Sequence, residues 1–429
     1  MAVPTHAPAA AAGQLDKTFA KGGIFLASNA GIKDSEATAV AIDSKGRIVV
    51  AGALGLQAAV SVVRLNSNGT LDTSFGGHSF QGIQAPAGVA IIDFFVSGEI
   101  ATCLVLQPDG KIVIGISIAG APNLLLARFD EDGTFDTSFA NGGLANLIFN
   151  GGPNTAFLVR QPDGKFLVGG GTLLARVTAD GKLDTTFGQD GRAPLVVTAN
   201  SIVLEPDGKI LAISGPTGNA QSTPLPPMSI NFLPVDSTIA RYNEDGSLDT
   251  GFGTLGRRTS IVGISAALLQ SNGQIVAAGP IFSKTLVDAE AQSLTSQTAF
   301  AVARYDSDGA IDNTFGSEGA VITSFGAPFA FASSVAIQSD GRIIAAGEVS
   351  GGFALARYTS AGVLDTSFGS SGTVLTSIGP SSSSNPAGIV AIALDAEGRL
   401  VAVGNVSLPN PTGYGRRHPS MVVARYLTQ

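Results

Sequence analysis

The chain contains very little of what disulfide, thiolate and histidine chemistry requires. Among its 429 residues there is a single cysteine, Cys103, which excludes an internal disulfide and any cysteine-based zinc or iron–sulfur site. Histidine occurs only three times, and the spacing gives no Ser–His–Asp arrangement. Tryptophan is absent and there are five tyrosines, which weakens a carbohydrate-binding interpretation because sugar faces usually stack on aromatic rings.

Charge and long apolar segments are also scarce. Charged residues make up 14% of the chain, and acids outnumber bases by 33 to 25, so we expect no nucleic-acid partner. No uninterrupted apolar run approaches the length of a membrane span, so we expect no transmembrane segment. The first residues lack the basic and hydrophobic regions of a signal peptide. We expect residues 1–12 to form a flexible leader, and the alternative is a mature N-terminus from which a signal has been removed.

What the chain does have is an internal repeat, supported by 44% hydrophobic residues and 55 glycines. Three short motifs, similar to LDTSF, QPDGKI and LARY, each recur seven times with an average spacing of about 58 residues. The aspartates of the first motif are Asp16, Asp72, Asp136, Asp184, Asp249, Asp312 and Asp365. The arginines of the third motif are Arg64, Arg128, Arg176, Arg241, Arg304, Arg357 and Arg425.

Each repeat unit contains four short strand candidates, which we call A to D. In the sixth unit they are residues 333–338, 342–347, 353–358 and 363–368. Several are continuously apolar, which is typical of strands buried on both faces. The pattern predicts an all-β fold, a seven-bladed β-propeller of four-stranded antiparallel blades, with residues 13–429 as its single domain.

The ends of the chain predict how this ring closes. The last unit ends on a strand C with no LDTSF motif after it, whereas residues 13–19 carry that motif with no strand C before it. We therefore expect residues 13–19 to be the outer strand of the last blade, with Arg425 facing Asp16.

The joint recurrence of LDTSFG, QPDGKI and LARY followed by an acidic turn, over residues 13–429, resembles the delta-60 repeat family of bacterial β-propellers. The order and spacing are also similar to the NHL-type propeller blade. This resemblance implies a bacterial origin and no particular reaction. Members of the family are frequently secreted or located at the cell surface, and the sequence itself leaves the location unknown. The localisation rests on the resemblance alone.

One spacing is constant throughout the repeats. Each LARY arginine precedes the next LDTSF aspartate by eight residues, as in Arg64 and Asp72, which indicates a tight hairpin with a bulged three-residue turn. That register places arginine and aspartate on opposite strands, so we expect structural ion pairs in all seven units. Sevenfold repetition argues against a catalytic role, because a propeller has one axial site.

The other connections vary in length. In an antiparallel meander the A–B and C–D turns share one end of the blades, the constant face, and the B–C and D–A connections share the other, the variable-loop face. Function usually resides in variable loops on a rigid scaffold. Two long B–C loops stand out, residues 215–236 and 405–420. Their candidate binding residues are Phe232, Tyr414, Arg416, Arg417 and His418.

Tyrosine and arginine are enriched at binding hot spots, so these loops could anchor a protein partner or an anionic ligand. The alternative is that the apolar loop, residues 215–236, packs over its own blade and that the basic cluster in residues 405–420 is solvated. Near the starts of the A strands on the same face lie Glu36, Glu99, Asn154 and Asn200. These oxygen donors could converge on one hard cation such as calcium. Their alternative interpretation is as solvated loop residues.

The sequence therefore predicts a non-catalytic binding or protein-interaction module that uses the variable-loop face. We expect a monomer with no cofactor and with an unidentified protein or small ligand as partner. Two alternatives remain open at this point: a metal-assisted hydrolase with a calcium-type site at the mouth of the central channel, and a carbohydrate-binding propeller.

Overall fold

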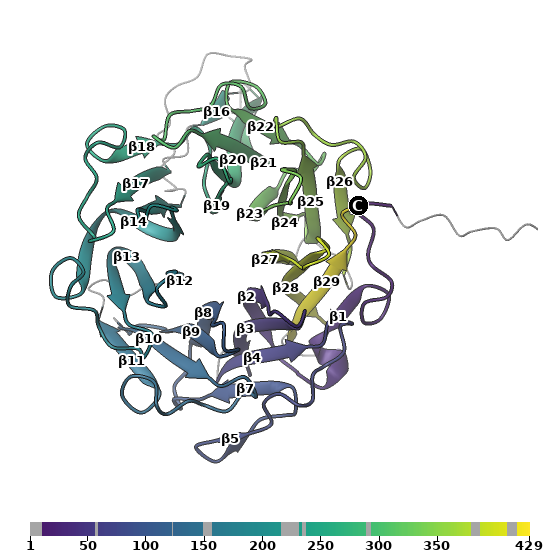
Figure 1. Cartoon of the computed structure of the whole chain (residues 1–429). Helices are drawn as coiled ribbons and strands as arrows, with labels where there is room; N and C mark the ends of the chain where they lie inside the picture. The colour runs from purple at the N-terminus through teal and green to yellow at the C-terminus, as the bar shows by residue number, and fades with distance from the viewer. Residues whose placement is uncertain are drawn as a thin grey trace, which may run out of the picture.

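A computed structural model describes residues 11–55, 59–121, 123–148, 157–215, 231–233, 237–288, 293–378, 387–409 and 418–429. The described strands form sheets that are arranged in a ring around a central axis (Figure 1). The helix among these residues is the 3-10 helix η1 (Ala27–Ala30), and none of the described residues form a helix with the length and hydrophobicity that crossing a bilayer requires.

Four sheets are regular four-stranded antiparallel blades. The first contains β2 (Glu36–Ile42), β3 (Ile48–Leu54), β4 (Ala59–Leu65) and β7 (Val89–Ile92). The second contains β8 (Glu99–Leu106), β9 (Ile112–Ile118), β10 (Asn123–Phe129) and β11 (Leu144–Ile148). A third contains β23 (Ala330–Ile337), β24 (Ile343–Val349), β25 (Gly352–Tyr358) and β26 (Thr373–Thr376). The last contains β27 (Gly388–Leu394), β28 (Leu400–Leu408), β29 (His418–Tyr426) and β1 (Ile24–Leu26).

Two larger sheets complete the ring. One is six-stranded, in the order β12 (Phe157–Arg160), β13 (Phe166–Val177), β14 (Arg192–Leu204), β15 (Ile210–Ser214), β17 (Thr238–Tyr242) and β18 (Arg257–Thr259). The other contains β16 (Asn231–Leu233), β20 (Ile275–Asp288), β21 (Ser293–Tyr305) and β22 (Ala320–Thr323), with β19 (Ala266–Leu269) paired to β20. A small hairpin, β5 (Ser79–Phe80) and β6 (Ile83–Gln84), lies outside these sheets.

The prediction of seven blades is wrong: counted as continuous sheets, the described residues form six blades, over which the seven repeat units are distributed. The difference lies in the third and fourth units, which share one sheet. Strand β14 continues from the outer edge of the third unit into the inner strand of the fourth, so both units are hydrogen-bonded into one ladder. The ladder shifts register between Gly171 and Leu173 and between Ala199 and Ser201, where the strands bend.

The predicted D strands are also misplaced, because the LDTSF motif forms a turn and not a strand. In the sixth unit Leu364 makes only an isolated bridge to Tyr358, and the outer strand is β26, which begins at Thr373. The side chain of Asp365 accepts hydrogen bonds from the backbone N–H of Ser367 at 3.1 Å and from its hydroxyl at 2.6 Å. This local turn directs Phe368 into the core, where it is fully buried.

The same displacement occurs where the ring closes. Leu15 makes an isolated bridge to Tyr426, but residues 13–19 are not the outer strand. That strand is β1, which pairs antiparallel with residues 422–424 of β29. Chain segments from the two ends therefore share the last blade, at a position that Figure 1 shows in purple and yellow.

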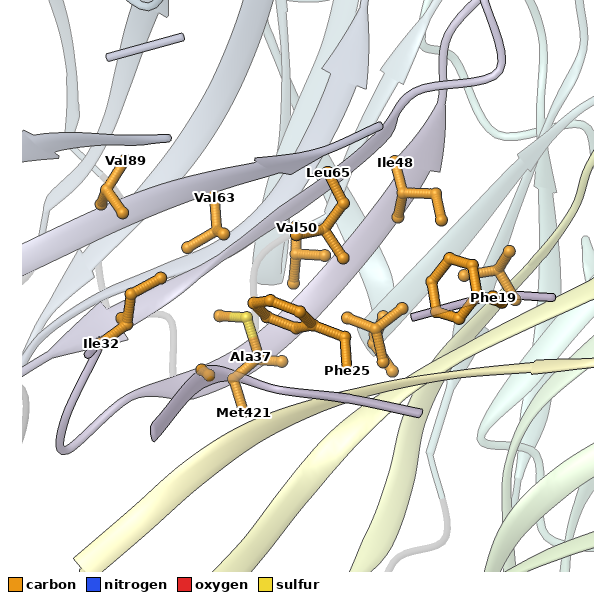
Figure 2. Packing of buried hydrophobic residues seen from close by; sticks show 14 of the residues in the cluster. Phe19, Phe25, Ile32, Ala37, Ile48, Val50, Val63, Leu65, Val89 and Met421 are labelled. Atoms are coloured by element: carbon orange, nitrogen blue, oxygen red, sulfur yellow. The ribbon is translucent and has the colours of Figure 1, made fainter. Parts of the chain in front are cut away.

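Apolar side chains fill the spaces between neighbouring blades. At the junction of the last and first blades, Phe19, Phe25 and Met421 pack against Val50 and Val63 (Figure 2). Burial of such side chains contributes roughly 1.5–3 kcal/mol each. Because each cluster needs two adjacent blades, an open ring would expose apolar surface on both sides of the gap.

Candidate functional site

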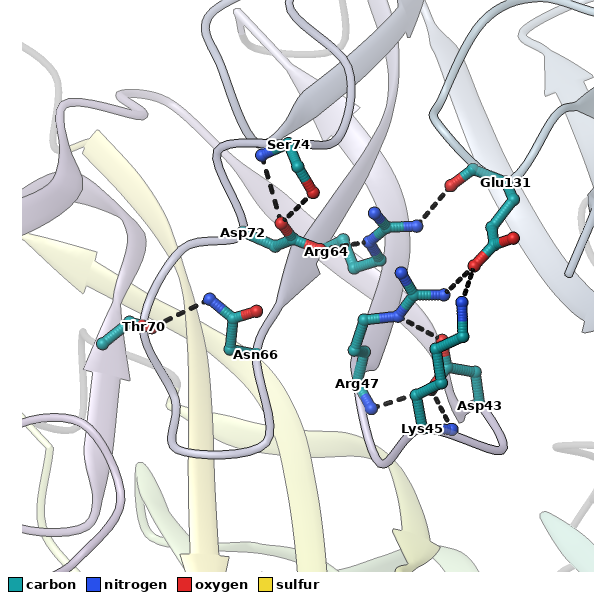
Figure 3. A network of polar contacts seen from close by, with 9 residues as sticks. All are labelled: Asp43, Lys45, Arg47, Arg64, Asn66, Thr70, Asp72, Ser74 and Glu131. Atoms are coloured by element: carbon teal, nitrogen blue, oxygen red, sulfur yellow. Dashed lines mark hydrogen bonds and ion pairs between the residues drawn. The ribbon is translucent and has the colours of Figure 1, made fainter.

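The repeated arginine and aspartate lie in contact on the constant face. In the first unit the Nε of Arg64 donates to Oδ2 of Asp72 at 2.7 Å, and the guanidinium lies 4.4 Å from the ring centroid of Phe75. The other carboxylate oxygen accepts hydrogen bonds from Ser74 (Figure 3). Burial favours a higher pKa for Asp72, but the hydrogen bonds from Ser74 and Arg64 outweigh it, and the pKa lies below its ordinary value.

All seven units repeat this arrangement, with Nε or Nη2 of the arginine 2.6–2.9 Å from the aspartate. The pairs are Arg64–Asp72, Arg128–Asp136, Arg176–Asp184, Arg241–Asp249, Arg304–Asp312, Arg357–Asp365 and Arg425–Asp16. Every arginine also lies over the LDTSF phenylalanine of its own unit, at 4.4–4.8 Å from the ring centroid. The repeated arginines and aspartates are engaged in these contacts within the protein, so they are not available to bind a ligand.

Sequence reasoning missed a second contact of these arginines. The Nη1 of each donates to a backbone carbonyl of the next unit. Arg64 donates to Glu131 and Arg128 to Ala179, both in hairpins, and Arg357 donates to Thr428, which follows β29. The last, Arg425, donates to Ser67 of the first unit. The constant face is therefore a closed chain of hydrogen bonds between units.

The LARY tyrosine makes a further tie between units. The hydroxyl of Tyr305 lies 2.6 Å from that of Ser260, and the hydroxyl of Tyr358 lies 2.7 Å from that of Thr323. In both cases the partner is in the outer segment of the preceding unit. Burial raises the pKa of Tyr358, so the phenol stays protonated as a hydrogen-bonding group.

The predicted calcium ligands do not form a site among the residues that the structure describes. Glu99 is fully buried, and its carboxylate accepts backbone N–H groups of Phe94 at 3.0 Å and Val96 at 3.1 Å. Burial raises the pKa of Glu99. Glu36 begins β2 and Asn200 lies at the register shift of β14. Asn154 lies outside the described residues.

Within the described ranges, no group of three histidine, cysteine, aspartate or glutamate side chains is placed to hold a metal ion. The buried carboxylate of Glu99 instead closes the turn between β7 and β8. The structure therefore gives no support to a converging calcium site.

The predicted loop residues are only partly described. Phe232 lies in β16, where its backbone pairs with Ser283, and Tyr414, Arg416 and Arg417 lie outside the described residues. His418 begins β29, and its Nδ1 lies 2.5 Å from Oδ1 of Asp34, in the segment before β2. This contact joins the last blade to the first on the variable-loop face.

Exposed apolar side chains mark the variable-loop face, a feature that sequence reasoning missed. Phe95 and Val96 lie between β7 and β8, and Phe95 is 65% exposed. Phe329, just before β23, is 53% exposed, and Phe331 near the start of that strand is also exposed. Ile261 occupies the corresponding connection between β18 and β19. The one signal in the sequence is that these residues lie outside the LDTSF motif, whose phenylalanine is buried in all seven units.

Comparison with known proteins supports a β-propeller repeat protein. The family model described as "Domain of unknown function (DUF5122) beta-propeller" matches residues 46–75, 107–139, 161–187, 234–252, 284–315 and 338–368. The comparison with curated proteins gives no match. Together with the observed ring of sheets, the family match places the chain among β-propeller repeat proteins.

The solved structures that match this chain share little sequence with it. Polysaccharide lyase Uly1 is 10% identical, with 91% of this chain and 90% of that chain covered and a TM-score of 0.44. A calcium-binding protein, regucalcin from Agrobacterium tumefaciens str. C58, is 11% identical, with 76% and 90% covered and a TM-score of 0.37. A protein of unknown function from Bacteroides caccae is 14% identical, with 64% and 80% covered and a TM-score of 0.35. We infer no activity from these likenesses.

Proposed function

We propose that the protein is a non-catalytic binding module that holds a protein partner or a small ligand on its variable-loop face. The observation that carries this proposal is the contrast between the two faces. On the constant face the repeated charges bind one another and the adjacent unit. On the variable-loop face, large apolar side chains such as Phe95 and Phe329 are exposed. Large apolar side chains exposed to solvent indicate a surface that a partner or ligand can cover.

The proposal also covers the location of the protein, its cofactor content and its oligomeric state. The LDTSFG, QPDGKI and LARY motifs support membership in the delta-60 repeat family and, with it, a bacterial secreted or cell-surface protein. We place no cofactor in the binding face and treat the functional form as a monomeric ring. A metal-assisted hydrolase is less well supported, because the described carboxylates of the variable-loop face do not cluster.

The test compares exposed apolar residues on the two faces. The immobilised full chain is screened against peptide and glycan libraries, and the ligands found are titrated against variants. The double variant Phe95→Ser/Phe329→Ser should lose binding. The control Val363→Ser should keep it, because Val363 is equally exposed, at 60%, but lies in a hairpin of the constant face.

The opposite pattern, with binding lost in Val363→Ser and kept in the double variant, would place the site on the constant face and overturn the proposal. Conversion of the bound ligand into a product, followed by mass spectrometry, would contradict the non-catalytic role.

A further inference from the structure

A groove of about 680 Å³ lies where the third and fourth repeat units share the six-stranded sheet. Its lining includes Val196 and Thr198 of β14, Ser214 at the end of β15, Thr238 at the start of β17, and Thr259 at the end of β18. These three strand ends all belong to the variable-loop face. The volume is within the range of small-molecule sites, about 300–1,000 Å³.

The strand register places a cation next to the hydroxyl groups. Thr238 pairs with Thr259 and Ala240 pairs with Arg257, so Arg257 and Thr259, two residues apart, lie on the same side of β18. Arg258 lies on the opposite side, where its Nη2 is 3.7 Å from the Asp308 carboxylate. Both arginines line the groove, but only Arg257 lies on the same side of β18 as Thr259, and the side chain of Arg258 is paired with Asp308.

Arg257 differs from the repeated arginines in having no acidic partner. Its side chain is exposed and makes no ion pair with any residue in the described part of the chain. The threonine hydroxyls beside it are also uncommitted: within the described ranges, Thr198, Thr238 and Thr259 make no side-chain hydrogen bond. The Ser214 hydroxyl accepts the backbone N–H of Thr238 at 2.8 Å and so fixes the two strand ends.

A strained apolar residue borders the same groove. Leu255 has a φ of +51° and is 69% exposed. Bulky residues rarely adopt this left-handed conformation, and exposure of the leucine side chain to water is also unfavourable in free energy. Three other units have the polar residues Asp190, Glu318 and Ser371 in this conformation three positions after the LDTSF phenylalanine. Of these four units, only the fourth has a large apolar side chain at this position.

We propose that this groove binds an anionic small molecule, an organic phosphate, sulfate or carboxylate. Arg257 holds its oxyanion through the fork of guanidinium N–H groups, and the hydroxyls of Thr238 and Thr259 donate to the remaining oxygens. The apolar part of the ligand lies against Leu255 and Val196, whose exposed side chains it would cover. The inference deepens the proposed function, since it rests on binding at the variable-loop face.

The test is calorimetric titration of the full chain, at constant ionic strength, with inorganic phosphate, n-butyl phosphate, n-butyl sulfate and butyrate. At least one butyl compound should bind saturably, and n-butyl phosphate should bind more tightly than inorganic phosphate. Arg257→Gln should weaken this binding about tenfold or more, because the charge-assisted hydrogen bonds are lost. The double variant Thr238→Val/Thr259→Val should weaken it several-fold, and Leu255→Asn should remove the preference for the butyl group, since asparagine tolerates a positive φ.

Arg192→Gln is the matched control, because Arg192 also begins the outer strand segment of its own unit and pairs there with an alanine. Its affinity should remain within about twofold of the wild type. Urea unfolding of each variant shows whether it folds, and Arg257→Lys, which keeps the charge without the fork, should bind with intermediate affinity.

Absence of saturable binding by all four probes, or an equal loss in the Arg192 and Arg257 variants, would overturn the inference. The two proposals fail separately. Suppose that Phe95→Ser/Phe329→Ser still binds the anion, and that no peptide or glycan ligand binds differently to the variants of the two faces. The proposed anion site in the groove would then stand, and the proposed interaction face would be wrong.

Discussion

Replacing Asp16 by alanine should destabilise the ring by removing the counter-charge of a buried arginine. Arg425 is 3% exposed, and its Nε and Nη2 lie 2.9 Å and 2.8 Å from Oδ2 of Asp16. Breaking one side of a buried ion pair typically costs about 3–5 kcal/mol. The substitution also removes the hydrogen bonds from Thr18 to Oδ1, at 2.9 Å and 2.6 Å, which add about 1 kcal/mol.

The matched substitution is Asp312→Ala, which removes the same type of pair within a continuous hairpin. Asp312 lies eight residues after Arg304, with Nε and Oδ2 2.6 Å apart, so the chain itself holds the two strands together. Asp16 and Arg425 have no such connection. Their segments are joined by backbone hydrogen bonds such as Asp16 N–H to Arg425 O at 2.8 Å and Leu427 N–H to Gln14 O at 2.9 Å. We therefore expect Asp16→Ala to loosen β1 and β29 specifically.

Urea unfolding followed by far-UV circular dichroism gives the loss of stability, and amide hydrogen exchange locates it. Both variants should unfold at lower urea, but only Asp16→Ala should accelerate exchange in residues 24–26 and 422–424. The double variant Asp16→Leu/Arg425→Met should recover much of the loss, because no unpaired buried charge remains. Equal urea midpoints for the two alanine variants, with unchanged exchange in β1, would refute this account of ring closure.

Two further predictions concern the contacts between units. Hydrogen bonds and arginines hold the pKa of the seven repeated aspartates below the ordinary value of 3.8, against the effect of burial. The stabilisation that these carboxylates give the folded protein is therefore complete above about pH 4, and it is lost as the pH falls through their lower native-state pKa values. The urea midpoint should therefore decrease below about pH 4, less steeply in Asp136→Asn, and a midpoint that rises on acidification would contradict the pairing. Tyr358→Phe should lower the free energy of unfolding by about 1–2 kcal/mol, because it leaves the buried Thr323 hydroxyl without its partner. In a double-mutant cycle with Thr323→Val the losses should be less than additive, and full additivity would show that the hydrogen bond contributes nothing.

The features that sequence reasoning predicted well are those set by short-range spacing. Eight residues between Arg64 and Asp72 leave room for one kind of hairpin, and the structure has the Asn66–Thr70 backbone hydrogen bond that this turn requires. The outer strands were misplaced because the hydrophobic LDTSF segment looks like a strand. Its aspartate instead caps a turn, as Asp365 does, and that preference competes with strand formation.

The joining of two units in one sheet had a weak signal in the sequence. Residues 195–205 contain neither glycine nor proline, so nothing in the chain interrupts β14 between its two sheet positions. Single-sequence patterns do not show whether such a segment bends at a loop or continues as a strand. That outcome depends on which neighbouring strands it meets.

The groove was not predictable for a related reason, because its lining residues come mostly from four different strands. Ser214, Thr238 and Thr259 are ordinary strand-end residues when taken singly, and only the pairing of β15, β17 and β18 brings them together. The exposed phenylalanines of the variable-loop face were missed because burial depends on the neighbouring blade. Phe75 belongs to the repeated LDTSF motif and is fully buried, whereas Phe95 lies outside any repeated motif, and this difference alone does not show that Phe95 is exposed.

Repetition itself helps to separate stabilising residues from binding residues in such a ring. A side chain present in every unit contacts its own unit and the next, so its role is to hold the ring together, as Arg64 and Asp72 show. A binding site for one ligand needs a feature that occurs once. Leu255 is such a feature, because equivalent turns have polar residues there. Arg257 occupies a strand position that Ala320 and Thr373 occupy in two other units and that Arg192 occupies in the third. Leu255 is strained and exposed, and Arg257 makes no ion pair in the described part of the chain, so a ligand in the groove would account for both residues.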